Sequence, residues 1–144
     1  MSSSVVIGAL NRLLAVHCQS VAMYLANTKP WAPRGEQQAQ VIFDDIVTNQ
    51  RHMIQRLAHC IDLLGGNPDC GQGHDYTVLN DLSLDFLLRR VIDDQYEIIR
   101  TIENCLADLD DIDTEANALA QESLGMAKGH LESLEEVPQN TVGS

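Results

Sequence analysis

The sequence predicts an all-α protein, an antiparallel four-helix bundle with one long crossover connection. Four long segments place apolar residues three or four positions apart, as helices with one buried face do. No segment alternates apolar and polar residues as a strand would. One connection is long, polar and rich in glycine, whereas the other two are short. Two helical hairpins joined by that connection, within a single domain covering residues 1–144, follow from this pattern.

The first helix is predicted over about residues 4–27 and the second over about 36–64. Proline and glycine residues between them break the helical pattern, and Gly65 and Gly66 are typical of a helix C-terminus. Each helix carries a second apolar stripe beside its main one. Because a small monomer has little use for a buried outer stripe, we expect a homodimer through this helix pair. The second stripes consist of Ile7, Leu14, Cys18, Leu25, Phe43, Val47, Ile54 and Ile61.

The third helix is predicted over about residues 80–109 and the fourth over about 114–136. The polar stretch that precedes the third helix, from Asn67 to about Thr77, is long enough to run the length of a bundle. An acidic turn, Asp108–Asp113, separates the third and fourth helices, and its charge favours the start of the fourth through the helix dipole.

Composition excludes several classes of function. A net charge of −12 disfavours binding to nucleic acid and to anionic membranes. No apolar run approaches the ~20 residues that span a bilayer, and the N-terminal residues do not resemble a signal peptide. The four cysteines form no Cys-x-x-Cys pair, which excludes zinc-ribbon sites. A cytoplasmic chain with reduced thiols is the simplest interpretation.

Each predicted helix offers one candidate metal ligand on or near its apolar face. His17, Asp94 and His130 share a face with apolar residues at helical offsets, and His52 lies at the edge of its stripe. Asn49 and Asp93 are additional candidates beside them, although Asp93 follows the polar face. Three imidazoles and one carboxylate suit one ion of Zn or Fe. A histidine–carboxylate hydrogen-bond network without metal would satisfy the same groups.

The segments that carry these residues resemble the ferritin-like superfamily, bacterioferritin in particular. LNRLLAVHCQSVAMYL is similar to the first helix of the family, in which a ligand glutamate stands at the position of His17. NQRHMIQRLAHCIDLLGGNP is similar to the second helix, and AKGHLESLEE to the fourth. The third helix matches weakly, with the family glutamate near Asp93 or Asp94. DNA-protecting miniferritins match less well at their ligand positions.

The resemblance implies a di-iron site bridged by two glutamates, and both are changed here. Asn49-x-x-His52 and Ala127-x-x-His130 stand in the two Glu-x-x-His places. Two divalent ions held close together need anionic bridges to offset their repulsion, so we expect ferroxidase chemistry to be lost or strongly reduced. The methionine that ligates haem in the family falls at Gln50, so no haem is expected. No fifth helix is predicted after Pro138, which argues against a 24-subunit cage but leaves an oligomer above the dimer open.

Three functions follow, in order of preference. The first is a metal-binding protein with a rebuilt, mononuclear, histidine-rich site and no assigned catalytic residue. The second is a metal-free dimeric scaffold or partner-binding bundle. A working ferroxidase or peroxidase ranks last because of Asn49 and Ala127.

Overall fold

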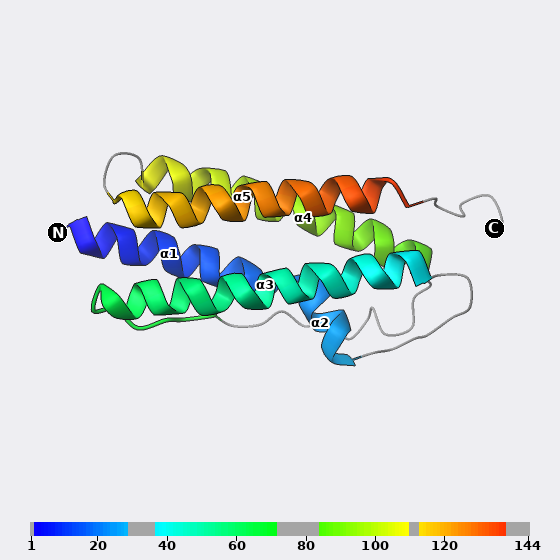
Figure 1. Cartoon of the computed structure of the whole chain (residues 1–144), viewed down its shortest axis with the longest axis horizontal. Coiled ribbons are helices and arrows are strands. Elements are labelled where there is room, and N and C mark those ends of the chain that lie inside the picture. Colours follow the sequence, from blue (N-terminus) through cyan, green and yellow to red (C-terminus); the bar gives the residue numbers. More distant parts are fainter. Residues whose placement is uncertain (1, 29–36, 72–83, 110–112, 138–144) are drawn as a thin grey trace.

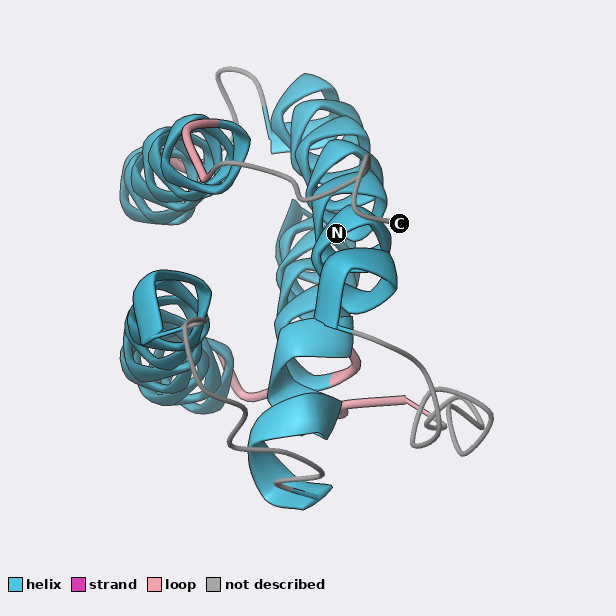
Figure 2. Cartoon of the chain, turned by 90° about the vertical axis from the view of Figure 1, so that its right-hand side faces the viewer, coloured by secondary structure: helices cyan, strands magenta, loops and turns pink. Residues whose placement is uncertain are grey.

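The computed structural model describes residues 2–28, 37–71, 84–109 and 113–137, and all regular structure within these ranges is helical. The elements are α1 (Ser2–Cys18), α2 (Val21–Thr28), α3 (Gln37–Leu63), α4 (Leu84–Leu109) and α5 (Thr114–Glu135). Helices α3 and α4 run in one direction and α1 and α5 in the other, so α3 ends at the opposite end of the bundle from the start of α4 (Figure 1). Viewed end-on, α1, α3, α4 and α5 occupy the corners of a bundle (Figure 2). The predicted all-α bundle is confirmed.

Local signals fix the helix ends close to their predicted places. Helix α3 ends where Gly65 adopts a φ of +86°, and the amide of Gly66 donates to the carbonyl oxygen of Ile61 at 2.9 Å. This pattern satisfies a terminal carbonyl through a left-handed glycine. Helix α5 begins after Asp113, whose carboxylate accepts a hydrogen bond of 2.8 Å from the amide of Ala116. Residues 80–83 of the predicted third helix lie outside the described residues.

The prediction of one continuous first helix over residues 4–27 is wrong, because the helix breaks after Cys18 and a second one starts at Val21. Two oxygens cap the new N-terminus. Ser20 Oγ accepts from the amide of Met23 at 3.0 Å, and Asp94 Oδ2 accepts from the amide of Val21 at 3.0 Å. These bonds satisfy amides that a helix start leaves without partners. The apolar stripe continues across the break, which is why periodicity did not reveal it.

The role of Asp94 as a cap leads to a stability prediction. Asp94→Ala removes a carboxylate that holds the α2 N-terminus from a neighbouring helix, and should lower the free energy of unfolding by about 1 kcal/mol. Asp93→Ala is the matched control, because Asp93 is exposed on the same helix. Urea denaturation at pH 7 compares the two variants. Equal midpoints for both would contradict the capping role.

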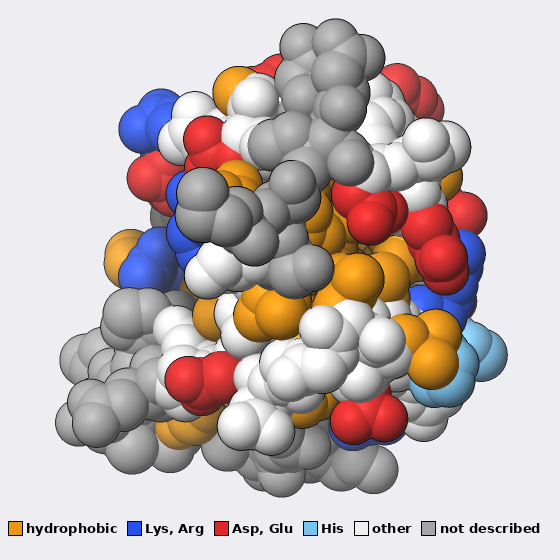
Figure 3. Space-filling view, turned by 90° about the vertical axis from the view of Figure 1, so that its left-hand side faces the viewer, with side chains coloured by type: hydrophobic (Ala, Val, Ile, Leu, Met, Phe, Trp, Pro, Cys, Tyr) orange, Lys and Arg blue, Asp and Glu red, His pale blue; other side chains and the backbone are white. Residues whose placement is uncertain are grey.

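The core consists of two apolar clusters, one toward each end of the bundle. The first cluster includes Leu10, Leu13, Met53, Leu57, Ile98, Ile102, Leu119 and Ala120. The second includes Val21, Leu25, Phe43, Ile46, Leu87, Val91, Leu134 and Val137. Figure 3 looks onto the end of the bundle where α1 begins and shows apolar side chains in the centre of that face with charged side chains around them. No helix in the described ranges is long and apolar enough to cross a membrane.

The second apolar stripes have a role within the chain. Leu14, Leu25, Phe43, Val47 and Ile61 are all buried in the single subunit. The single subunit therefore covers most of these stripes without a partner, and Ile7, Cys18 and Ile54 are partly buried. The homodimer through α1 and α3 stays a prediction. The second apolar stripes on which it was based are explained, for the most part, by packing within one subunit.

The prediction that all four cysteines are reduced is wrong for two of them. Cys18 and Cys70 form a disulfide with a Cα–Cα separation of 5.6 Å, whereas Cys60 and Cys105 are free and buried. The two bonded residues are 52 positions apart and lie side by side only because the segment after α3 passes the end of α1. The cytoplasmic location, which rested partly on reduced thiols, stays a prediction.

Candidate metal centre

Between the two apolar clusters lies a set of buried polar side chains, which we call the central polar layer. Within the described ranges every buried polar or charged side chain belongs to it: His17, Ser20, Gln50, Gln95, Ser123 and His130. On α3 and α4 the layer residues, Gln50 and Gln95, lie between a stretch of the first cluster and a stretch of the second, and on α5 His130 lies between Ala127 of the first and Leu134 of the second. The layer spans about two helical turns, since Ser123 and His130 are seven residues apart on α5.

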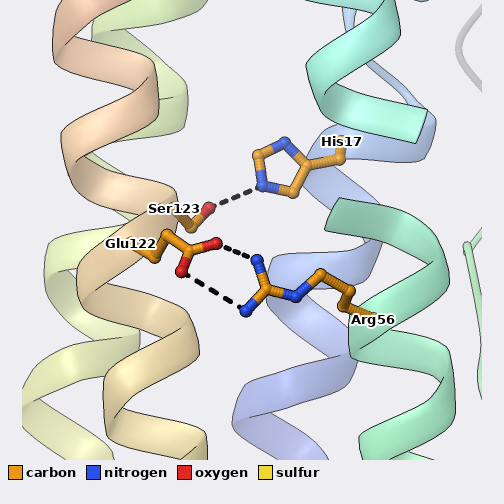
Figure 4. A network of polar contacts seen from close by, with 4 residues as sticks. All are labelled: His17, Arg56, Glu122 and Ser123. Atoms are coloured by element: carbon orange, nitrogen blue, oxygen red, sulfur yellow. Dashed lines mark hydrogen bonds and ion pairs between the residues drawn. The ribbon is translucent and has the colours of Figure 1, made fainter. Parts of the chain in front are cut away.

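His17 enters the layer from the last turn of α1 and is completely buried. Its Nε2 lies 2.7 Å from Ser123 Oγ of α5, while its Nδ1 has no hydrogen-bond partner (Figure 4). Burial lowers the pKa of His17 to about 4, and the nearby His130 acts in the same direction. The ring is therefore neutral at pH 7, which is the form that ligates metals.

His130 enters the layer from α5 and is 8% exposed. The amide Nδ2 of Asn49 on α3 donates to His130 Nε2 at 2.9 Å, and Nδ1 is buried without a partner. Burial lowers the pKa of His130, partly offset by Asp45. A surface pocket of about 410 Å³ reaches this ring between α3 and α5, and Asp45 and Gly129 are among the residues that line it.

The other predicted ligands lie elsewhere. His52, Asn49 and Asp93 are exposed, and Asp94 is half-buried with its carboxylate on the Val21 amide. Among the residues that the structure describes, no three His, Cys, Asp or Glu side chains form a group that could hold a metal ion. Of the four residues proposed as one set of ligands, His17 and His130 alone belong to the central polar layer.

Four residues of the layer were missed by sequence reasoning. Ser20 Oγ donates to Gln50 Oε1 at 2.7 Å, and Ser123 contacts His17. Gln95 is completely buried, and neither its Nε2 nor its Oε1 has a partner. A signal for Gln95 existed, since it follows Val91 by four residues and precedes Ile98 by three, the spacing of the buried face. The sequence pattern was searched for histidine and carboxylate ligands, so neutral residues on the same faces were not considered.

An ion pair lies at the surface near one part of the layer. Arg56 of α3 and Glu122 of α5 join across the seam next to the His17–Ser123 contact (Figure 4). Both side chains are about half exposed, 51% and 52%, so the pair adds little stability.

The donor set does not fit two bridged metal ions. Ala127 is 1% exposed and offers no ligand atom, and Asn49 is neutral. The buried donors that remain are neutral imidazole and amide groups. Among the described residues, the buried side-chain polar atoms without a partner are Nδ1 of His17, Nδ1 of His130 and the amide atoms of Gln95, and all belong to the central polar layer. Buried polar atoms normally have a partner, so these atoms mark a place where a polar ligand would be stabilised.

Comparisons with known proteins support the fold. No family model and no curated protein matches the sequence. Among solved structures, a mutant of Mycobacterium smegmatis Dps1 is similar, with a TM-score of 0.77, 16% identity, and coverage of 93% of this chain and 95% of that one. A ferritin-like, diiron-carboxylate protein from Bacillus anthracis str. Ames has a TM-score of 0.72, 20% identity, and coverage of 94% and 96%. The chain therefore has a ferritin-like fold.

Proposed function

We propose that this ferritin-like protein binds a single divalent transition-metal ion, Fe or Zn, in its central polar layer and has little or no ferroxidase activity. His17 and His130 would hold the ion through Nδ1. One observation carries the proposal: two buried imidazoles, His17 of α1 and His130 of α5. In each ring Nε2 makes a hydrogen-bond contact with another side chain, and Nδ1 has no partner.

The contacts on the Nε2 atoms favour this role. A metal-bound imidazole usually donates its other N–H to an oxygen, which fixes the ring orientation. Ser123 Oγ, 2.7 Å from His17 Nε2, can accept that hydrogen bond. Asn49 can do the same for His130 once its amide rotates to present Oδ1. On this proposal Asn49, which stands where the resemblance places a bridging glutamate, supports a ligand and is not one.

The remaining ligands would be neutral. Gln95 Oε1 is buried without a partner in the same layer and is the nearest chemical match for an oxygen ligand. Two imidazoles and amide or water oxygens suit borderline ions such as Zn²⁺ and Fe²⁺. Without a bridging carboxylate, a second divalent ion would be repelled by the first. One ion per chain, with little oxidase chemistry, follows from this ligand set.

A second function is favoured by a different observation. Both histidines already have a protein partner on another helix, Ser123 for His17 and Asn49 for His130. These bonds would stabilise a metal-free bundle that serves as a dimeric scaffold or binds a partner. Thermal melting separates the two functions, because a ligand that binds the folded state raises the melting temperature. The scaffold predicts equal melting temperatures with Zn²⁺ and with a chelator.

The direct test is calorimetric titration of chelator-treated protein with Zn²⁺ at pH 7. We expect about one ion per chain for the wild type, and at least a tenfold weaker affinity for His17→Gln and for His130→Gln, since each loses a ligand nitrogen. His59→Gln is the matched control, because His59 is exposed on α3 and lies outside the polar layer.

Unchanged zinc affinity in both layer variants would refute the site. The same variants also test the expected loss of oxidase chemistry. Oxygen-dependent oxidation of Fe(II) by the wild type should not exceed the rate in buffer. A rate well above buffer that disappears in His130→Gln would restore the ferroxidase hypothesis.

A further inference from the structure

The Cys18–Cys70 disulfide joins two parts of the chain that differ in accessibility. Cys18 is the last residue of α1 and is partly buried, whereas Cys70 is exposed in the segment that follows α3. A small dithiol in solvent therefore reaches the sulfur of Cys70 more easily than that of Cys18. Thiol–disulfide exchange depends on this access.

Apart from the disulfide, the segment 67–71 contacts Asn11 of α1 and Gln19, which follows α1, through exposed polar groups. Asn11 Nδ2 donates to the carbonyl oxygen of Asn67 at 3.2 Å, and Asn11 Oδ1 accepts from the amide of Asp69 at 2.8 Å. Gln19 Nε2 donates to the carbonyl oxygen of Cys70 at 2.6 Å. Asn67, Asp69 and Cys70 are themselves exposed, so water competes for each of these bonds. The disulfide is the one contact here that water cannot replace.

The same bond lies next to the central polar layer. Cys18 directly follows His17, and the helix breaks at the next two residues. The amide of Gln19 donates to the carbonyl oxygen of Ala15 at 2.9 Å, and the amide of Ser20 makes a long contact of 3.5 Å with the carbonyl oxygen of His17. The last carbonyls of a helix have no partner within the helix, so a helix end opens more readily than its middle unless tertiary contacts hold it. The disulfide from Cys18 to Cys70 is such a contact.

We propose that the Cys18–Cys70 disulfide is a reversible two-electron switch that orders the last turn of α1 and thereby the position of His17. In the oxidised chain the bond holds residues 67–71 against α1. In the reduced chain that segment separates from α1, and the turn that carries His17 opens more often. The switch goes beyond the proposed function and needs no metal ion.

The reaction balances with a dithiol as reductant. One thiolate of the dithiol attacks Sγ of exposed Cys70, forming a mixed disulfide and releasing Cys18 as a thiolate. The second thiolate of the dithiol then displaces Cys70 and closes the oxidised dithiol. The protein gains two electrons, and two protons from the dithiol complete its two thiols. An oxidised dithiol reverses each step.

The experiment uses the full chain with Cys60 and Cys105 replaced by alanine, so that Cys18 and Cys70 are its only thiols. Amide hydrogen exchange and the imidazole ¹⁵N signals of His17 are recorded by NMR before reduction, after excess dithiothreitol and after reoxidation. We expect exchange at Asp69 and at residues 18–20 to rise about tenfold on reduction, a shift of the His17 signals, and full reversal on reoxidation. Amides of α5 provide the internal control.

Two results would overturn the switch. One is a disulfide that dithiothreitol does not reduce in the folded chain. The other is a reduced chain whose exchange at these positions and whose His17 signals match the oxidised chain. If the double-alanine background fails to fold, the same measurements are made on the wild-type chain, in which Cys60 and Cys105 are buried. The metal-free protein is used throughout, so a failure here is distinct from a failure of zinc binding.

Discussion

Replacing Cys18 and Cys70 together with alanine is expected to lower the free energy of unfolding by about 4 kcal/mol. The disulfide links residues 52 positions apart, and a link of that span removes much of the conformational entropy of the unfolded chain. Urea denaturation of oxidised wild type and of the double variant measures the difference. Reduced wild type is the matched control, because its midpoint should fall to that of the variant.

The outcome that contradicts this account is a double variant as stable as the oxidised wild type. Such a result would mean that Cys18 and Cys70 are not bonded in the native chain. A variant that loses stability, but whose midpoint still falls on adding reductant, would also be inconsistent, since the two remaining cysteines are free.

The second large effect is a loss of stability in acid caused by His17. Its pKa falls from 6.5 to about 4 on folding, because burial disfavours the charged ring. Above pH 6.5 the ring is neutral in both states and folding has no protonation penalty. As pH falls from 6.5 to 4, the unfolded chain takes up the proton and the folded chain does not, so about 3 kcal/mol of stability is lost. The pKa of His130 is also lowered, which adds to the loss.

Denaturation midpoints between pH 7 and pH 4 test this prediction. His17→Gln should flatten the pH dependence, because glutamine does not titrate, even if the variant is less stable at pH 7. His59→Gln is the control for the substitution itself, since that side chain is exposed on α3. An unchanged slope in His17→Gln would show that the buried ring is not the acid-sensitive group.

Helical periodicity was sufficient for the fold because each long helix buries one continuous stripe. The predicted helix ends at residues 64 and 136 lie one residue beyond the ends of α3 and α5, and the predicted start at residue 36 lies outside the described residues. The break after Cys18 could not be predicted from local sequence. One of the two groups that cap the new helix start is Asp94, which is 73 residues from Val21 in the sequence. The disulfide was equally hidden, since no local spacing indicates which distant cysteines meet.

Periodicity also placed His17 and His130 on buried faces, but it could not decide which polar residues share one depth. His52 lay at the edge of its stripe, and the structure puts it on the surface. Asp94 shares a face with apolar residues, yet it is half-buried and caps α2. Gln95 is the buried neighbour. One position around a helix is a rotation of about 100°, so small differences in helix packing decide between adjacent residues.

Anomalous diffraction at the zinc edge, from crystals grown with Zn²⁺, tests the central claim most directly. One strong peak is expected in the polar layer, about 2.1 Å from Nδ1 of both His17 and His130. Zinc found only at surface residues such as His52, with both buried rings keeping their present contacts and no density between them, would contradict the claim and leave a metal-free bundle.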